Sequence, residues 1–264
     1  MGGIRRRRAG LVASVLALVM LAWTGSGAAA DTLSERIVGG SRVAIEDHPW
    51  VVYLMNPGGL QYCGGTIAAP TKIVTAAHCV AEREPGSVRV VAGREDKNSR
   101  DGVVARVRNI WVHPKYQSAS QGEDIAVLTL DRRLPYPSLP LADEEDTRLY
   151  TAGTVARVYG WGNTSEGGVS SRYLLGATVP LVSDRDCAMS YREYDRTAMV
   201  CAGYPEGGID ACQGDSGGPL VVAGKLVGVV STGDGCARPR KPGIYTRVAT
   251  YADEVRAQLG ESDR

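Results

Sequence analysis

The stretch "ACQGDSGGP" occupies residues 211–219 and leads directly into "PLVVAGKLVGVVS" at 219–231. The first part places Ser216 among three glycines and directly behind Asp215. The second part is apolar and rich in β-branched residues on both sides of Ala223-Gly224, a composition typical of two antiparallel strands joined by a tight turn. Ser216 is therefore a candidate nucleophile at a glycine-rich turn of a β-rich protein.

Similar β-rich runs recur along the whole chain between Gly, Pro, Asp and Asn. A helical pattern is scarce and is limited to about 183–191 and 250–259. The chain is therefore predicted to be all-β with two barrel-like halves, and "LPYPSLP" at 134–140 marks the crossover between them. The other predicted strands are "WVVYLM" (50–55), "KIVTAA" (72–77), "SVRVVAG" (87–93), "VVARVRNIWV" (103–112), "DIAVLTL" (124–130), "TVARVYGW" (154–161) and "IYTRV" (244–248).

The N-terminus and the bulk composition indicate an exported globular protein. The net charge of +1 over 264 residues does not favour nucleic-acid binding. Four arginines at 5–8, the apolar run 11–23 and Ala28–Ala30 follow the order of a signal peptide. We expect residues 1–30 to be removed. An uncleaved anchor is less favoured, because the apolar run is shorter than the roughly 20 residues that a membrane span needs.

Six cysteines lie in the part of the chain that follows the predicted signal peptide. An even number of cysteines in an exported chain favours disulfides, although six cysteines allow 15 pairings and the spacing does not choose among them. Zinc is the competing explanation, but the chain contains no C-x-x-C and no H-E-x-x-H pattern. The cysteines are Cys63, Cys79, Cys187, Cys201, Cys212 and Cys236.

The pattern G-x-S-x-G at 214–218 has three interpretations: the nucleophile turn of an α/β-hydrolase, the nucleophile loop of a β-barrel serine protease, or a turn without chemistry. A serine nucleophile needs a base, and the three histidines of the chain, His48, His78 and His113, all precede Ser216. The α/β-hydrolase order places the histidine after the serine, so this order is excluded.

His78 is the candidate base because it ends the apolar run "KIVTAAHC" beside Cys79, where a disulfide would hold it rigidly. His48 and His113 precede prolines at strand ends, which favours a structural role. The candidate acid is Asp124, which opens the alternating run "DIAVLTL". The order His78, Asp124, Ser216 is one of the known orders of a Ser-His-Asp triad.

The chain resembles the trypsin-like serine proteases of the chymotrypsin fold, most of all the bacterial trypsins. The resemblance runs from Ile37 to about Leu259 and implies two antiparallel six-stranded β-barrels, at about 37–138 and 139–250, with the active site between them and a short C-terminal helix at about 250–259. It rests on "IVGG" (37–40), "TAAHC" (75–79), "DIAVLTL" (124–130), "GWG" (160–162), "CAGY" (201–204), "CQGDSGGP" (212–219) and "KPGIYTRV" (241–248).

The resemblance assigns the catalytic roles. Ser216 attacks the scissile carbonyl, His78 takes the serine proton and passes it to the leaving amine, and Asp124 orients His78. Ser231 in "VVST" is similar to the serine that the family places beside this aspartate. The backbone N–H groups of Gly214 and Ser216 are the implied donors to the oxyanion of the tetrahedral intermediate.

The resemblance also implies activation by cleavage. In "SERIVGG", a cut after Arg36 would release residues 31–36 as an activation peptide and free the Ile37 ammonium. This ammonium is expected to pair with Asp215 and to order the loop that carries Gly214. The residues from 37 to 264 would then form the mature protease domain.

Substrate specificity is assigned to Asp210, six residues before Ser216, where trypsins carry a carboxylate at the floor of the pocket. Such a carboxylate selects Arg or Lys, and Gly233 and Gly243 match the small residues that keep the pocket open. Ala211 lacks a hydroxyl that would help to solvate a lysine ammonium, so arginine is expected to be preferred. Thr232 departs from the family, which usually has an aromatic residue there.

The predicted function is that of a secreted serine endopeptidase that cleaves after Arg or Lys, is made as a zymogen and acts as a monomer on proteins or peptides. The reaction is expected to require no cofactor, and a structural calcium ion is left open. Protein protease inhibitors are also left open as partners. Nucleic acid is not expected as a partner, and neither is a membrane once the signal peptide has been removed. The alternatives are a non-catalytic protease homologue and an α/β-hydrolase esterase. The family's disulfides would join Cys63 to Cys79, Cys187 to Cys201 and Cys212 to Cys236.

Overall fold

The computed structural model describes residues 1–3 and 37–260. The chain divides into two units, Met1–Leu33 and Ser34–Arg264, and the account below concerns the second unit. The predicted signal peptide, the activation peptide and Arg36 lie outside the described residues, apart from the first three positions.

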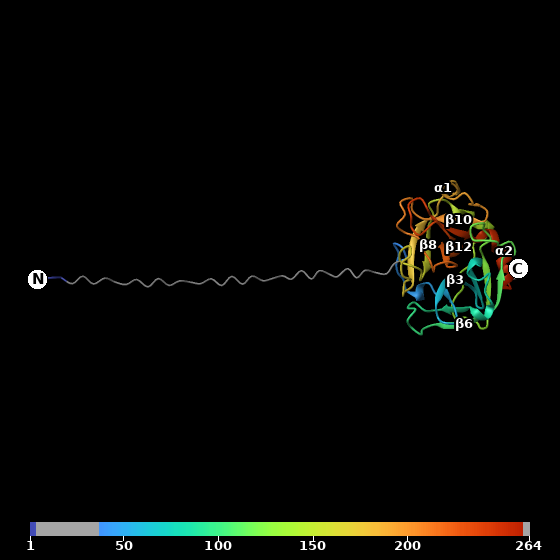
Figure 1. The fold of residues 1–264 in the computed structure, drawn as a ribbon, viewed down its shortest axis with the longest axis horizontal. Helices are drawn as coiled ribbons and strands as arrows, with labels where there is room; N and C mark the ends of the chain where they lie inside the picture. The colour runs from blue at the N-terminus through green and yellow to red at the C-terminus, as the bar shows by residue number, and fades with distance from the viewer. Residues whose placement is uncertain (4–36, 261–264) are drawn as a thin grey trace. The chain divides into compact units, whose positions relative to one another are not determined.

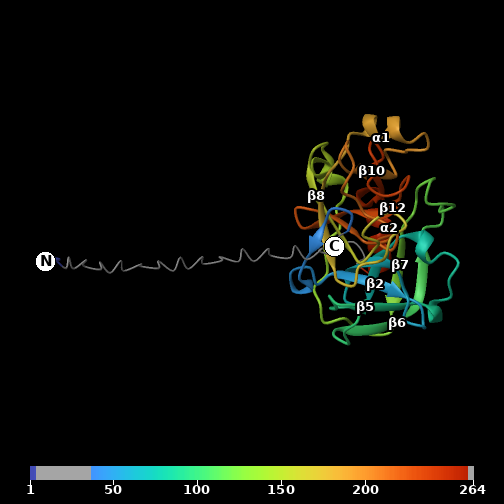
Figure 2. The same ribbon diagram turned by 60° about the vertical axis from the view of Figure 1, so that its left-hand side comes forward.

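The first half of this unit is a closed six-stranded barrel with the strand order β2-β3-β4-β7-β6-β5, and every neighbouring pair is antiparallel. Figures 1 and 2 show it as the lower half of the folded part, with β3 and β6 labelled in Figure 1 and β2, β5, β6 and β7 labelled in Figure 2. The strands are β2 (Val51–Met55), β3 (Gln61–Ala69), β4 (Lys72–Thr75), β5 (Arg89–Ala92), β6 (Val103–Val112) and β7 (Ala126–Leu130).

The second half is a curled antiparallel sheet of seven strands in the order β1-β9-β8-β11-β12-β13-β10. A bridge between Leu181 and Ala202 brings β9 and β10 together, so six of the strands nearly close on themselves. The seventh is β1, which pairs with β9, although its residues lie in the predicted first half. The strands are β1 (Ser41–Arg42), β8 (Val155–Gly160), β9 (Leu175–Pro180), β10 (Met199–Ala202), β11 (Pro219–Val222), β12 (Lys225–Thr232) and β13 (Gly243–Arg247).

Two α-helices occur in the described part of the chain, and both lie where the sequence predicts helical pattern. Helix α1 (Asp184–Ser190) begins at Ser183, whose hydroxyl accepts a hydrogen bond from the Asp186 backbone N–H. Helix α2 (Ala252–Leu259) ends at Gly260, which adopts the left-handed conformation common at helix C-termini. The 3-10 helices are η1 (Ile45–Asp47), η2 (Ala77–Cys79), η3 (Pro85–Ser87), η4 (Glu144–Tyr150) and η5 (Val248–Tyr251).

The predicted hairpin at Ala223-Gly224 joins β11 to β12. Both residues have positive φ, 49° and 76°, which matches the twist of antiparallel strands and explains why a glycine stands at the second position. Ser216 lies just ahead of β11, so this hairpin holds one end of the nucleophile loop. The all-β fold predicted from the sequence is confirmed, with one closed barrel and one curled sheet.

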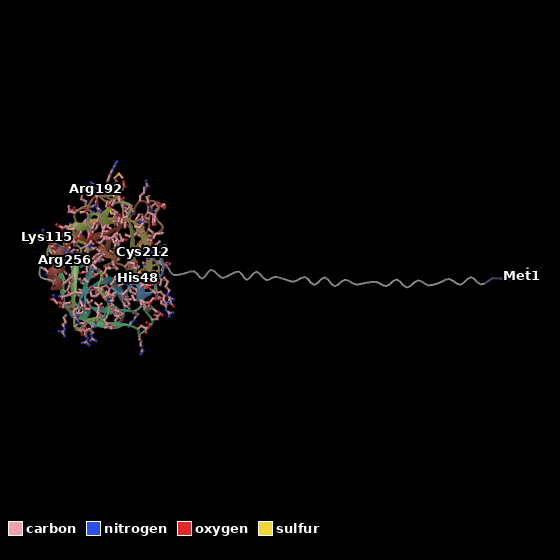
Figure 3. The ribbon with its side chains drawn as sticks, turned by 180° about the vertical axis from the view of Figure 1, so that it is seen from behind. Met1, His48, Lys115, Arg192, Cys212 and Arg256 are labelled. Atoms are coloured by element: carbon pink, nitrogen blue, oxygen red, sulfur yellow. A yellow bond between two sulfur atoms is a disulfide. The ribbon has the colours of Figure 1, made fainter. Side chains whose placement is uncertain are left out.

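Each half has its own hydrophobic core, because every strand turns one face inward. In the barrel, this core includes Val52, Leu54, Ile67, Ile73 and Leu128, all fully buried. In the curled sheet, it includes Val158, Leu175, Leu220, Val227 and Tyr245. Figure 3 shows the side chains of both halves and labels Arg192, in the segment after α1, at the outer end of the second half.

Candidate active site

Asp124 and His78 meet at the edge of the first barrel. His78 lies in η2, directly after β4, and Asp124 lies just before β7, the strand that pairs with β4. Their side chains are joined by a contact of 2.7 Å between His78 Nδ1 and Asp124 Oδ2. The His78 backbone N–H also donates to Asp124 Oδ1 over 2.8 Å. The carboxylate therefore holds both the ring and the backbone of His78.

Asp124 is 1% exposed and is held from the second half of the molecule as well. Ser231, the penultimate residue of β12, donates its hydroxyl to Asp124 Oδ2 over 2.6 Å. Thr246 in β13 donates its hydroxyl to the main-chain oxygen of Asp124 over 2.7 Å. A buried polar group is costly without a hydrogen-bond partner, and these two hydroxyls supply partners for the carboxylate and the main-chain oxygen of Asp124. Ser231 was singled out from the sequence, whereas nothing in the sequence pointed to Thr246.

Ser216 is fixed between the two halves by its backbone. Its carbonyl oxygen accepts a hydrogen bond of 2.7 Å from the Gly64 N–H in β3, and the next residue, Gly217, donates to Val230 in β12. The Cys79 sulfur, beside His78, lies 3.6 Å from the same carbonyl oxygen. Thus the loop that carries Ser216 contacts both the His78 end of the barrel and the Ser231 strand of the curled sheet.

Gly217 and Gly64 allow this close approach of backbone. A Cβ atom added to Gly217, whose φ is +81°, would lie 2.2 Å from Thr75 Oγ1 and 2.7 Å from the Gly64 oxygen. A Cβ atom on Gly64 would lie 3.0 Å from Gly218 Cα. Side chains are therefore absent at Gly217 and Gly64 because the nucleophile loop and the first barrel approach each other too closely there for a Cβ atom.

Asp215 points away from Ser216 into the interior and is fully buried. Its Oδ1 accepts from the Gly162 N–H over 2.7 Å, and its Oδ2 accepts from the Cys212 N–H over 3.0 Å. Burial raises the pKa of this carboxyl to about 6, although the two backbone donors oppose the shift. A Cβ atom on Gly160 or Gly162 would lie within 2.4 Å of a carboxylate oxygen, so "GWG" makes room for Asp215.

The loop at Gly214 is held from β3. Gly214 has a φ of +96°, which a side chain would disfavour, and its carbonyl oxygen accepts a hydrogen bond of 2.8 Å from Gln61 Nε2. Lys97 in turn donates to Gln61 Oε1 over 3.0 Å. Gln61 and Lys97 were not predicted from the sequence, because only the folded chain brings them to a loop more than 100 positions away.

Asp210 lies at the wall of a cavity of about 200 Å³ that also reaches Ser216. It is 4% exposed and accepts from the Ala211 N–H over 2.8 Å and from the Ala237 N–H over 3.1 Å. Burial raises the pKa of Asp210 to about 7, against the effect of both donors. A buried carboxylate without a cation is an incomplete pair, and a positively charged side chain in this cavity would complete it. Gly233 and Gly243 line the same cavity.

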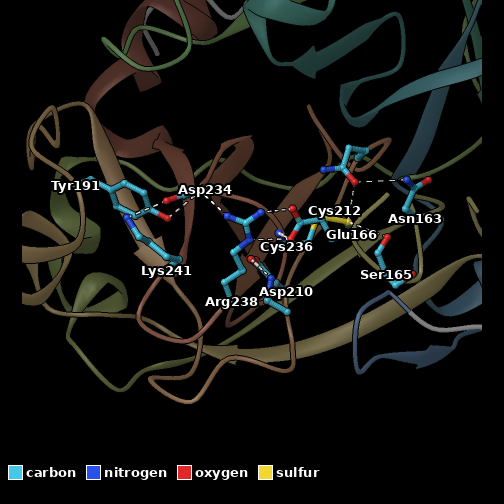
Figure 4. A network of polar contacts seen from close by, with 12 residues as sticks. Asn163, Ser165, Glu166, Tyr191, Asp210, Cys212, Asp234, Cys236, Arg238 and Lys241 are labelled. Carbon is cyan, nitrogen blue, oxygen red and sulfur yellow. Dashed lines mark hydrogen bonds and ion pairs between the residues drawn. A yellow bond between two sulfur atoms is a disulfide. The ribbon is translucent and has the colours of Figure 1, made fainter. Parts of the chain in front are cut away.

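The structure contains three disulfides, Cys63–Cys79, Cys187–Cys201 and Cys212–Cys236, the same pairs that the family resemblance implies. The first ties β3 to the residue after His78. The third joins the segment before Ser216 to a wall of the Asp210 cavity, as Figure 4 shows. Each is expected to contribute about 2–4 kcal/mol to the free energy of unfolding.

Comparison with known proteins gives the same picture. The family model for trypsin matches residues 37–255. The chain belongs to the trypsin family. It is 52% identical over 223 residues to a trypsin of Saccharopolyspora erythraea, an alignment that covers 84% of this chain and 98% of that protein. It is 43% identical to trypsin eta of Drosophila melanogaster, covering 84% and 88%, and 42% identical to a vitellin-degrading protease of Bombyx mori, covering 83% and 84%.

As a member of the trypsin family, this protein is a serine endopeptidase that acts on proteins. Ile37, the first residue of the family match, is fully buried in the core of the curled sheet. The Val38 oxygen accepts a hydrogen bond from the Asp210 N–H over 3.2 Å, so the segment after Ile37 contacts a residue that lines the cavity.

The only group of three potential metal ligands among the described residues consists of Cys63, His78 and Cys79. Both sulfurs belong to a disulfide and the imidazole is bound to Asp124. Calcium prefers six to eight oxygen ligands, so this group of two sulfurs and an imidazole does not suit a calcium ion.

Proposed function

We propose that this protein is a secreted, trypsin-like endopeptidase that cleaves after Arg or Lys, with Arg preferred. The single observation that supports this specificity most strongly is the buried carboxylate of Asp210 in the cavity that reaches Ser216, bound there by two backbone N–H groups. An arginine or lysine side chain would supply the missing positive charge. An apolar side chain would leave the carboxylate buried and unpaired, at a cost of several kcal/mol.

In the proposed mechanism, Ser216 Oγ attacks the scissile carbonyl carbon while His78 Nε2 takes the hydroxyl proton. The resulting oxyanion accepts hydrogen bonds from the Gly214 and Ser216 N–H groups, each of which contributes roughly 10²–10³ in rate. His78 then gives the proton to the leaving amine, which departs and leaves an acyl-enzyme. Water, activated by His78, attacks the ester and restores Ser216. In every step, Asp124 accepts a hydrogen bond from His78 Nδ1–H, which leaves Nε2 on the opposite side of the ring free to exchange the proton with Ser216.

We also infer that the chain is a zymogen activated by cleavage after Arg36. The new Ile37 ammonium would pair with Asp215, whose buried carboxylate is bound by the backbone N–H groups of Gly162 and Cys212. Breaking such a buried pair costs about 3–5 kcal/mol, which is enough to hold the strained Gly214 loop. The proposal is tested with Asp215→Asn in an Ile37-terminated protein; retention of full activity would contradict it.

Secretion rests on the predicted signal peptide at residues 1–30. Over the described residues, none of the helices is long and apolar enough to cross a membrane. We propose that the mature enzyme acts as a monomer, requires no cofactor for the reaction, and is open to protein inhibitors that fill the Asp210 cavity. Sequencing the N-termini of the secreted zymogen and of the mature enzyme tests the two cuts, because the zymogen should begin at Asp31 and the mature chain at Ile37.

The decisive experiment measures hydrolysis of amide substrates with Arg, Lys or Phe at P1 by the Ile37-terminated protein. Ser216→Ala is the control. Cleavage after Arg and Lys that is lost in the control would support the triad and the Asp210 pocket together. Cleavage after Phe alone would keep the endopeptidase and overturn the specificity.

A further inference from the structure

An ion-pair bridge crosses the outer wall of the Asp210 cavity. The Arg238 guanidinium contacts both oxygens of Glu166, with 2.8 Å between Nε and Oε2. Its Nη1 also donates to Asp234 Oδ1 over 3.1 Å. Asp234 Oδ2 is bound in turn by Lys241 Nζ over 3.0 Å. Figure 4 shows these four side chains, hereafter the rim bridge, next to the Cys212–Cys236 disulfide and Asp210.

The rim bridge joins two loops that are distant in the sequence. Glu166 lies in the loop between β8 and β9, whereas the other three residues lie between β12 and β13, in the segment that forms the cavity wall. Glu166 Oε2 also accepts a hydrogen bond of 3.4 Å from the Cys236 N–H. A Cβ atom on Gly235 would lie 2.2 Å from Arg238 Nε and 2.6 Å from Glu166 Oε2, so the pair lies directly against the backbone of the wall.

The wall under the bridge holds the specificity carboxylate through Ala237. Ala237 precedes Arg238, and its N–H donates to Asp210 Oδ2. Its φ is +55°, a left-handed conformation that is unfavourable for a residue with a Cβ atom. Surrounding contacts must therefore impose this conformation. On one side, the Ala237 oxygen accepts from the Gly208 N–H over 2.9 Å. On the other side, the neighbouring Arg238 is held by Glu166 and Asp234.

We propose that Glu166 and Arg238 are positioning residues for P1 specificity. By holding residues 234–238 in place, they keep the Ala237 N–H on Asp210 and so set the affinity of the cavity for a cationic side chain. This inference rests on the cationic specificity proposed above. The side chains of Arg238 and Glu166 are 48% and 39% exposed, and isolated pairs at such exposure contribute little. The parallel double contact and the second carboxylate distinguish this pair from an isolated one.

The test measures binding of benzamidine, a small aromatic amidinium that mimics a P1 arginine, to the Ile37-terminated protein. Variants Arg238→Gln and Glu166→Gln are compared with the double variant. Each single variant should raise the Kd for benzamidine and the KM for Arg amides by about 3–10-fold while kcat changes by less than about 2-fold. The double variant should be no weaker than the single variants, because both remove the same contact.

Arg132→Gln is the matched control. Arg132 contacts both oxygens of Asp131 and is 55% exposed, but the pair follows β7 in the first barrel, away from the cavity. This variant should bind benzamidine as the wild type does. Active-site titration and thermal unfolding would verify that each variant is mature and folded. If the glutamine variants do not fold, Arg238→Lys, which keeps the charge but loses the double contact, carries the same expectation.

Single variants with a Kd within 2-fold of the wild type, an equal shift in Arg132→Gln, or effects that multiply in the double variant would each overturn the inference. The proposed function fails in a different way: the wild type itself would then neither bind benzamidine nor cleave after Arg and Lys.

Discussion

Thr246 in the curled sheet donates its hydroxyl to the main-chain oxygen of Asp124 beside the barrel, over 2.7 Å and with both residues almost fully buried. Glu123, which precedes Asp124, has a φ of +53°, unfavourable for a residue of its type. The strand that carries Thr246 also contributes Gly243 and Tyr245 to the Asp210 cavity. One strand therefore supports both Asp124, the proposed acid of the triad, and the Asp210 cavity.

Removing the Thr246 hydroxyl should slow catalysis. Thr246→Val keeps the shape of the side chain but leaves the Asp124 oxygen without its donor, so the turn at Glu123–Asp124 can relax and misalign the carboxylate. We expect kcat to fall about 10-fold with KM nearly unchanged, which corresponds to about 1.4 kcal/mol. Steady-state kinetics on an Arg amide measure both constants, and Thr246→Ser should restore kcat.

The matched control for this variant is Thr66→Val. Thr66 is equally buried in the barrel, but its hydroxyl has no hydrogen-bond partner within the described structure. Its replacement should leave kcat unchanged and should not lower stability. A Thr246→Val enzyme with wild-type kcat, or a Thr66→Val enzyme with the same loss, would contradict the role given to the Thr246–Asp124 contact.

Binding of cations in the cavity should depend on pH through Asp210. Burial raises the pKa of Asp210 to about 7, so the empty cavity holds a neutral acid below this pH and a carboxylate above it. A cation binds the carboxylate, so the affinity for benzamidine should rise up to about 10-fold per pH unit below 7 and level off above it. Titration from pH 5.5 to 8.5 measures this, and a flat profile would exclude it.

The same shift predicts how Asp210 affects stability. Its pKa is raised on folding, so between about pH 4 and 7 the folded state binds a proton that the unfolded state has released. The contribution of Asp210 to the free energy of unfolding is therefore lost as pH rises through this window. The side chain in Asp210→Asn does not titrate. The Tm of this variant minus the Tm of the wild type should therefore increase by several degrees as the pH is raised from 5 to 8. A constant difference in Tm would contradict the assignment.

A hydroxyl beside Asp210 should alter the choice between Arg and Lys. Ala211 lines the cavity, and its N–H is already bound to Asp210 Oδ1. In Ala211→Ser, the added hydroxyl can accept a hydrogen bond from a lysine ammonium, which has fewer fixed contacts than a guanidinium. The ratio of kcat/KM for an Arg amide to kcat/KM for the matching Lys amide should fall by about 3–10-fold. An unchanged ratio would show that the hydroxyl does not reach the ammonium.

Crowding Asp215 should impair both stability and activity. A Cβ atom at Gly162 would lie 2.4 Å from Asp215 Oδ2 and 2.5 Å from its Cγ, and the buried carboxylate has no room to move. Gly162→Ala is expected to lower the free energy of unfolding by about 1–3 kcal/mol. It should also lower kcat/KM by about 10-fold or more, because Asp215 adjoins Gly214. Chemical denaturation and amide hydrolysis measure the two effects.

Gly86→Ala provides the comparison, because a Cβ atom there meets nothing within 4 Å and the backbone needs no positive φ. This variant should retain wild-type stability and activity. Equal behaviour of the two alanine variants would mean that the room left by Gly162 has no part in holding Asp215.

The β-rich pattern of the chain predicted the fold, and the order His78, Asp124, Ser216 predicted a triad in which the structure brings His78 and Asp124 into contact. The fold could be predicted because turn glycines, alternating strands and the helix start at Ser183 depend only on residues that are neighbours in the sequence. The predicted second barrel is a curled sheet in which six strands nearly close, and it also recruits Ser41 and Arg42 as β1. A two-residue strand has no periodicity, so only its pairing with β9 reveals it.

The sequence by itself determined which candidate groups this protein carries: a nucleophile, a base, three carboxylates that the fold buries and six cysteines. Only the tertiary structure decided what holds them. Gln61 and Thr246 contact residues 153 and 122 positions away. Glu166 and Arg238 lie 72 positions apart and act through the backbone of the cavity wall. Hydrogen bonds and ion pairs form between groups within about 3 Å of each other, and distance in space is set by the closure of the barrel and the curl of the sheet, which no short stretch of sequence records.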